Sequence, residues 1–222
     1  MGSIISLTAQ DGHILTAYEA KPSSGDGRAL VLIQEIFGIN SHIRAVADDY
    51  AANGYHVIAP SLFDRIEQNI QFGYDEASIG KGLELMQKTS FEMALADIAA
   101  AQAALPDGKR GVIGYCWGGT LSWLSATRLS GFSAAAVYYG GGIGNFASED
   151  PSCPVIAHFG TNDEMIPVAE AEKLGDLHAD EVELHLYPAT HGFNCDERGS
   201  FDPESAKLAK TRTLAFFDKH LG

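Results

Sequence analysis

The residues best suited to chemistry stand in residues 111–120, where an apolar run ends in Gly-Tyr-Cys-Trp-Gly. This is the Gly-x-Ser-x-Gly pattern of a nucleophile elbow, with Cys116 in the place of the serine. Glycines flank such a nucleophile because the turn from strand to helix leaves no room for side chains. The start of a helix also favours a thiolate, because its backbone N–H groups carry partial positive charge. A free cysteine packed as a small hydrophobe is the alternative interpretation.

An acid and a histidine that could complete a catalytic triad follow Cys116 in the expected chain order. Asp163 follows the apolar run 155–159, and His191 follows the run 182–187. The carboxyl ends of neighbouring parallel strands lie at one edge of a sheet, so the three side chains can converge there. Asp163 would then hold the imidazole tautomer, and His191 would carry the proton.

Both partners also have plainer interpretations. Asp163 could cap a turn, with Glu164 as the competing acid, and His191 could be a surface histidine. The other histidines lie within expected strands, on helices or at edges, and none is placed as His191 is: His13, His42, His56, His158, His178, His185 and His220.

The elements that must position these residues alternate along the chain. Apolar runs of strand length occupy residues 14–18, 29–33, 55–59, 111–114, 134–139, 155–159 and 182–187. Helical spacing occupies residues 42–53, 92–104, 118–129, 168–177 and 203–220. Strands roughly 25–30 residues apart with helices between them predict an α/β fold, a mainly parallel sheet with helices on both faces.

Two segments depart from this alternation. Residues 14–18 alternate only weakly, and we expect them to form an edge strand. Residues 62–90 are polar with scattered glycines and could form part of a lid or pocket wall. A surface excursion with one short helix is the alternative.

Composition excludes several classes of protein. The chain has 222 residues, 45% hydrophobic and 20% charged, which is typical of a single domain over residues 1–222. Its net charge of -14 comes without a basic stripe, so no nucleic-acid partner is expected. No stretch reaches the roughly 18–20 apolar residues of a membrane span. Residues 1–10 lack the features of a signal peptide, so we expect a cytoplasmic protein with no membrane partner.

The three cysteines, Cys116, Cys153 and Cys195, are an odd number without CxxC spacing. This argues against a secreted disulfide framework and for a reducing compartment. Cys195 lies close to His191, but a metal site needs three or four ligands and no cluster supplies them. We therefore expect no metal and no cofactor.

Taken together, the segment Gln-Glu-Ile-Phe-Gly at residues 34–38, the cysteine elbow, the Asp163 loop and the His-Gly-Phe segment at residues 191–193 closely resemble the dienelactone hydrolases. These enzymes, also called carboxymethylenebutenolidases, are a cysteine-nucleophile branch of the α/β-hydrolases. The resemblance runs from about residue 14 to the last helix. It implies a single-domain α/β-hydrolase fold.

The resemblance also implies roles for individual residues. Cys116 would attack a lactone or ester carbonyl, and the backbone N–H groups of Trp117 and Ile36 would form the oxyanion hole. Glu35 would pair with the neutral thiol in the resting state and be displaced by substrate. Without the resemblance, Glu35 would be interpreted as a helix-capping or exposed carboxylate.

The sequence departs from the family where the substrate carboxylate is bound. Family members use two arginines, one in the excursion after the fourth strand and one shortly after the catalytic histidine. Here Lys81 is the nearest cation in the excursion, with Arg65 further away. Cys195 occupies the second aligned position, and Arg198 follows it. Lys81 and Arg198 could bind an anion or be solvated surface cations.

Tyr115 could line a pocket for a planar substrate, although packing on the helix side is the more ordinary use of such a residue. The leading hypothesis is a hydrolase that opens a small-molecule lactone or enol ester, dienelactone-like, through a thiol-ester intermediate. A general carboxylesterase or thioesterase with the same triad is the close alternative. A non-catalytic small-molecule-binding protein of this fold is a third hypothesis. We expect a monomer or a small homo-oligomer.

Overall fold

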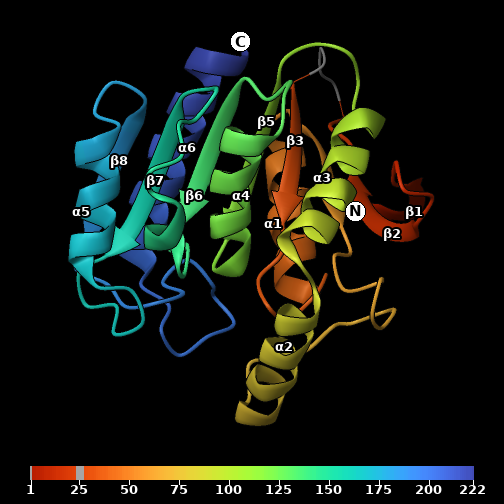
Figure 1. The fold of residues 1–222 in the computed structure, drawn as a ribbon, viewed down its shortest axis with the longest axis horizontal. Helices are drawn as coiled ribbons and strands as arrows, with labels where there is room; N and C mark the ends of the chain where they lie inside the picture. The colour runs from red at the N-terminus through yellow and green to blue at the C-terminus, as the bar shows by residue number, and fades with distance from the viewer. Residues whose placement is uncertain (1, 24–27) are drawn as a thin grey trace. The chain divides into compact units, whose positions relative to one another are not determined.

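The computed structural model describes residues 2–23 and 28–222 and divides into two compact units, Met1–Arg110 and Gly111–Gly222. Both units combine strands with helices (Figure 1). The single domain over residues 1–222 stays a prediction.

The first unit contains four strands in the order β1-β2-β4-β3. These are β1 (Ser3–Thr8), β2 (Ile14–Ala20), β3 (Ala29–Ile33) and β4 (His56–Pro60). β2 pairs antiparallel with both β1 and β4, and β3 pairs parallel with β4. The prediction of an edge strand at residues 14–18 is therefore wrong, because β1 covers that edge. Most β1 side chains are exposed, so its sequence lacks the apolar run of a buried strand.

Three helices complete the first unit: α1 (Ser41–Ala52), α2 (Glu76–Lys88) and α3 (Phe91–Ala104). Figure 1 shows α1 and α3 on opposite faces of the strands of this unit. Each helix begins after a side chain that accepts a backbone N–H of the first turn, which is ordinary N-capping: Asn40, Asp75 and Ser90.

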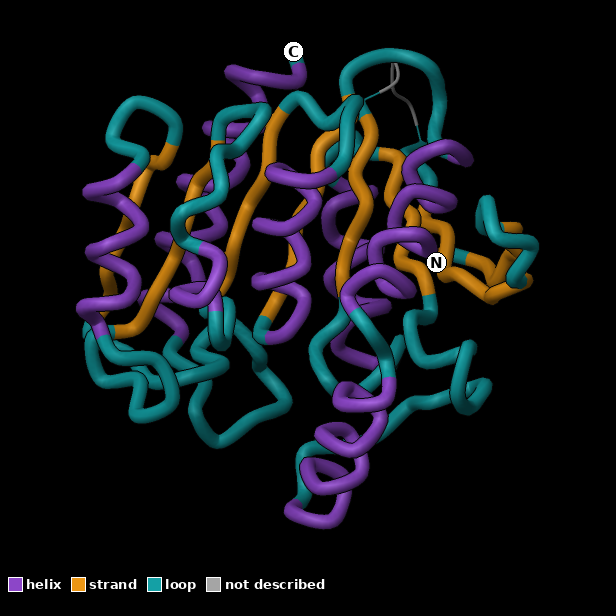
Figure 2. Tube along the Cα trace, in the orientation of Figure 1, coloured by secondary structure: helices purple, strands orange, loops and turns teal. Residues whose placement is uncertain are grey.

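The excursion at residues 62–90 contains α2, which extends past the ends of the strands of its unit (Figure 2). Before α2, the chain returns to the loop that follows β3. Gly38 and Gln71 form an isolated bridge, and the N–H of Phe72 donates to the carbonyl of Phe37 at 2.9 Å. The excursion thus packs against residues 34–38, the segment that the resemblance singled out.

The second unit contains four parallel strands in the order β5-β6-β7-β8. These are β5 (Arg110–Tyr115, beginning at the last residue of the first unit), β6 (Ala134–Tyr138), β7 (Val155–Gly160) and β8 (Val182–Tyr187). Every residue of β6 and β7 is buried, which explains their uninterrupted apolar sequence. β8 is buried mainly at its two ends.

The helices of the second unit are α4 (Trp117–Arg128), the short 3-10 helix η1 (Ile143–Phe146), α5 (Val168–Leu177) and α6 (Pro203–Leu221). In Figure 1, α4 and α5 cover one face of these strands and α6 covers the other. The prediction of an α/β fold with mainly parallel strands and helices on both faces is confirmed. Across residues 2–23 and 28–222, none of the helices combines the length and the apolar character needed to cross a membrane.

A buried polar network ties α6 to the strands of the second unit. The Nδ1 and Nε2 atoms of His158 lie 2.8 Å from Tyr187 Oη and 2.8 Å from Thr213 Oγ1, respectively. Tyr138 Oη lies 2.7 Å from the same threonine oxygen. Burial holds the pKa of His158 well below its ordinary value, so its imidazole is neutral.

Candidate active site

Cys116 occupies the turn between β5 and α4. Its backbone has φ 55° and ψ -122°, a left-handed φ that few residues other than glycine adopt. Its N–H donates to the carbonyl of Tyr138 at 3.0 Å. A side chain at Gly114 would collide with the carbonyl oxygen of Gly118, and one at Gly119 would place Cβ 2.5 Å from the carbonyl oxygen of Tyr138. The glycines are therefore required by the tightness of this turn.

The structure brings the three predicted triad side chains together. His191 Nε2 lies 3.2 Å from Cys116 Sγ, and His191 Nδ1 lies 2.8 Å from Asp163 Oδ2. The other carboxylate oxygen of Asp163 accepts the backbone N–H groups of Met165 and Ile166 at 2.8 and 3.2 Å. Asp163 is thereby fixed by its own loop, with one oxygen left for the histidine.

The charged forms of Asp163 and His191 stabilise each other. Burial acts to raise the pKa of Asp163, but its hydrogen bonds with His191 and with backbone N–H groups outweigh burial and lower the pKa. Burial acts to lower the pKa of His191, but the hydrogen bonds to Asp163 and Cys116 outweigh burial and raise the pKa to about 10. The histidine is thus protonated at neutral pH, in a position to stabilise a thiolate.

Tyr139 is a neighbour of the cluster that the sequence analysis missed. It is fully buried, has a φ of 38°, and its ring meets the His191 ring edge-on with centroids 5.2 Å apart. The ring of Phe193 packs against Tyr139 at 5.3 Å. The sequence gives no functional signal for Tyr139, because it falls in an apolar run at the end of a strand.

In the first unit, Glu35 is buried, with 1% of its surface exposed. Tyr74 Oη donates to Glu35 Oε2 at 3.2 Å, and Asn40 Nδ2 donates to Tyr74 Oη at 3.1 Å. The N-cap of α1 is Asn40, so the alternative interpretation of Glu35 as an exposed or helix-capping residue is wrong. Sequence analysis missed Tyr74, because its contact spans 39 residues and no local pattern encodes it.

The two residues predicted to supply oxyanion-hole N–H groups occupy different units. Trp117 opens α4, where the N–H groups of the first turn point out from the helix N-terminus. Ile36 lies in the loop after β3, and its backbone carbonyl packs so closely on Gly82 of α2 that a side chain there would collide. Their roles stay predictions.

The residues predicted to touch substrate have different surroundings. Tyr115 is almost fully buried and packs against Tyr138 and Tyr139, with ring centroids 4.6 and 6.2 Å apart, so its visible role is packing. The guanidinium of Arg198 is half-buried and lies against Gly192, next to His191 in the chain.

The cations of the excursion lie in the first unit. Lys81 is exposed on α2 and lines a cavity of about 360 Å³ together with Glu84. Arg65 forms salt bridges to Asp97 and Asp11 at 2.8 and 2.6 Å, so its charge is already balanced. Of the two, Lys81 is the better placed to meet an anion.

The remaining cysteines, Cys153 and Cys195, are buried. Burial raises the pKa of Cys153 to about 11, which keeps that thiol protonated and unreactive. Within residues 2–23 and 28–222, no group of three or more histidine, cysteine, aspartate or glutamate side chains could hold a metal ion.

A parallel α/β unit with an elbow cysteine, followed by an aspartate and a histidine at the ends of later strands, has the form of an α/β-hydrolase. Comparison with known proteins identifies the family within this class. A sequence model of the dienelactone hydrolase family matches residues 15–221. The chain belongs to the dienelactone hydrolase family and is an ester hydrolase.

Relatives align over nearly their whole length. "Carboxymethylenebutenolidase 1" of Cupriavidus pinatubonensis is 30% identical over 95% of this chain and 94% of that protein. A Synechocystis sp. protein named "Putative carboxymethylenebutenolidase" is 34% identical over 93% of this chain and 92% of its own. The crystal structure of a "Putative Dienelactone Hydrolase" from Klebsiella pneumoniae is 32% identical, with a TM-score of 0.83 over 98% of this chain and 99% of that one.

Proposed function

We propose that the protein hydrolyses a lactone or enol ester through a Cys116–His191–Asp163 triad and a thiol-ester intermediate. The observation that carries the proposal is the unbroken line of contacts from sulfur to imidazole to carboxylate, at 3.2 and 2.8 Å. A binding protein would have no need of this alignment. A positive φ at Cys116, a strained conformation, is likewise typical of functional positions.

In the first half of the reaction, the Cys116 thiolate attacks the carbonyl carbon and forms a C–S bond. The carbonyl electrons move to oxygen, and the N–H groups of Trp117 and Ile36 are proposed to stabilise that oxyanion. When the carbonyl reforms, the C–O bond breaks and the enolate leaves. The His191 imidazolium gives the enolate its proton and becomes neutral.

In the second half, neutral His191 takes a proton from water while the water oxygen attacks the thiol ester. The C–S bond then breaks, the carboxylic acid leaves, and the thiolate–imidazolium pair is restored. Asp163 holds the Nδ1–H tautomer throughout, so that Nε2 faces the reacting atoms. Between turnovers, Glu35 is proposed to pair with Cys116 as the neutral thiol. When substrate displaces Glu35, its carboxylate takes the thiol proton and leaves the thiolate beside the His191 imidazolium, and Glu35 returns that proton to the sulfur after the product leaves.

An enol ester suits this nucleophile because an enolate is a good leaving group, whereas a peptide amide requires stronger protonation. Recognition of a carboxylate on the substrate would fall to Arg198, beside the His191 loop, and to Lys81. Cys195 stands where the family resemblance places an arginine. That substitution favours a general carboxylesterase or thioesterase as the second candidate.

The test compares wild type, Cys116→Ser and Cys116→Ala on a dienelactone and on an uncharged aryl ester. We expect turnover of both substrates by wild type and loss of turnover in Cys116→Ala, with Cys153→Ala as an unaffected control. Turnover of the aryl ester alone would favour the second candidate and keep the triad. Full activity in Cys116→Ala would refute the nucleophile.

A further inference from the structure

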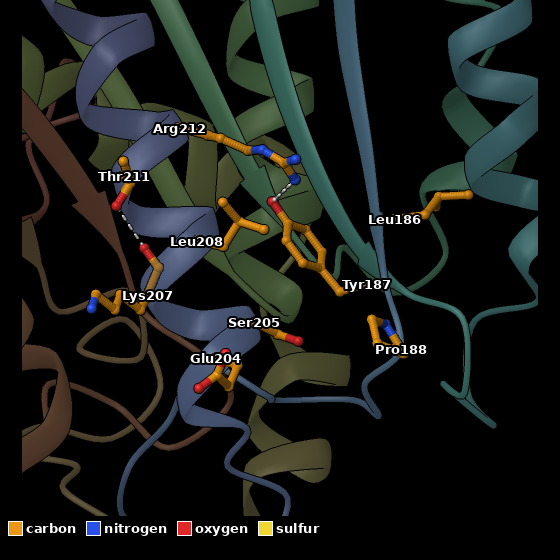
Figure 3. Close-up of a pocket in the computed structure, with 9 residues that line it drawn as sticks. All are labelled: Leu186, Tyr187, Pro188, Glu204, Ser205, Lys207, Leu208, Thr211 and Arg212. Atoms are coloured by element: carbon orange, nitrogen blue, oxygen red, sulfur yellow. Dashed lines mark hydrogen bonds between the residues drawn. The ribbon is translucent and has the colours of Figure 1, made fainter.

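A cavity of about 480 Å³ opens between α6 and the end of β8 in the second unit (Figure 3). Its volume falls within the range of roughly 300–1,000 Å³ that is usual for small-molecule sites. Cys116, Asp163 and His191 are not among the described residues that line it. The mechanism proposed above therefore leaves this cavity unused.

Arg212 provides a cation at one end of the cavity. Its Nη1 donates to Tyr187 Oη at 3.1 Å, and its guanidinium lies over the Tyr187 ring at 5.4 Å (Figure 3). Among the residues that the structure describes, Tyr187 is its one hydrogen-bond partner, and no carboxylate forms a salt bridge with it. A guanidinium carries five N–H donors in one plane, so further donors remain for a bidentate carboxylate.

The walls next to Arg212 are apolar. Leu208 has 45% of its surface exposed, and Pro188 also lines the cavity, whereas Figure 3 shows the side chain of Leu186 extending away from Tyr187. Figure 3 shows Leu208 extending from α6 toward the Tyr187 ring. An apolar ligand would remove this hydrocarbon surface from water, which is favourable.

The charges define how such a ligand would be oriented. Glu204 lines the cavity in the first turn of α6, eight residues before Arg212, which corresponds to about 12 Å along the helix axis. Its carboxylate disfavours an anion at that end. Lys207 also lines the cavity, but Figure 3 shows its ammonium pointing to the side of α6 away from Tyr187. An acidic group is therefore favoured at Arg212 alone.

We propose that this cavity is a second binding site, which takes a small molecule with one carboxylate and an apolar or aromatic body. The carboxylate accepts hydrogen bonds from Arg212, and the body lies against Pro188 and Leu208. The site is separate from the triad, so its occupancy does not depend on the proposed hydrolysis.

The test is calorimetric titration of the full-length protein, alkylated at Cys116 with iodoacetamide to block the nucleophile. Phenylacetate is the probe, and phenylacetamide is the uncharged control of the same shape. We expect one phenylacetate per chain and at least about tenfold weaker binding of the amide. No binding at millimolar phenylacetate, or equal binding of the amide, would overturn the proposal.

Three variants locate the site. Arg212→Gln removes the guanidinium, Leu208→Trp fills the cavity from an exposed position, and Lys207→Gln is the matched loss of a charge that points away. We expect the first two to weaken phenylacetate binding by about tenfold or more and Lys207→Gln to leave it within twofold. Unchanged binding in Leu208→Trp would overturn the proposal even if Arg212→Gln failed to fold.

Discussion

Replacing Asp163 with asparagine tests the electrostatics of the cluster while preserving its shape. The side-chain oxygen of the asparagine can still accept the N–H groups of Met165 and Ile166 at the positions they now occupy. Its NH₂ group would then face His191 Nδ1, which could only accept. The imidazole proton would move to Nε2, the atom that faces Cys116 sulfur, and the histidine could no longer receive a proton there.

The size of the effect follows from the pKa of His191, which its surroundings raise from an ordinary 6.5 to about 10. The hydrogen bond to Asp163 contributes most to that rise, and the hydrogen bond to Cys116 contributes next most. Asp163→Asn removes that partner and therefore lowers the pKa of His191, and each pH unit of lowering removes about 1.4 kcal/mol of imidazolium stabilisation. Loss of the productive tautomer adds to this, as in serine proteases, where the same change lowers kcat by about 10⁴.

The assay is the pH profile of kcat/KM on an aryl ester. For wild type we expect the alkaline limb near pH 10, where His191 loses its proton. Asp163→Asn is expected to lower kcat/KM by up to about 10⁴ and to move that limb to lower pH. Glu164→Gln is the matched control, because Glu164 is exposed and adjacent in the chain. A wild-type rate and profile in Asp163→Asn, or an equal loss in Glu164→Gln, would rule out this role for Asp163.

Three further predictions concern stability. Gly119→Ala forces Cβ against the carbonyl of Tyr138, the acceptor for the N–H of Cys116, and should cost about 1–3 kcal/mol in urea unfolding and reduce turnover; an unchanged midpoint and rate would contradict this. Thr213→Val leaves the buried polar atoms of His158 and Tyr138 without their shared partner, the Thr213 hydroxyl. Each unpaired group should lower the free energy of unfolding by about 1–3 kcal/mol. A urea midpoint within error of the wild-type value would contradict this prediction. The lowered pKa of His158 means that, below about pH 6.5, the imidazole takes up a proton in the unfolded chain and not in the folded one. The free energy of unfolding should therefore decrease as the pH is lowered below about 6.5, by at most about 1.4 kcal/mol per pH unit. An equal slope in His158→Gln would count against this assignment.

The elements that local sequence encodes could be predicted from it. The runs 29–33 and 182–187 coincide with β3 and β8, and the helix at residues 168–177 coincides with α5. β1 could not be predicted, because its side chains are mostly exposed and it is held by backbone pairing with β2. An exposed strand has no apolar run to reveal it.

The same distinction applies to the candidate site. Cys116, Asp163 and His191 could be proposed because each follows a recognisable strand, and parallel topology then places them at one edge. Tyr139 and Tyr74 could not be proposed, because their contacts with His191 and Glu35 join segments 52 and 39 residues apart. No local periodicity carries such pairings.

In the proposed reaction, Cys116 carries the acyl group between the two half-reactions. Intact-protein mass spectrometry on enzyme quenched in acid during turnover of a slow aryl ester tests this directly, with peptide mapping to locate the adduct. We expect a mass increase equal to one acyl group, located on residues 111–120 and absent from Cys116→Ala. Turnover without an adduct, or an adduct on any other residue, would contradict it.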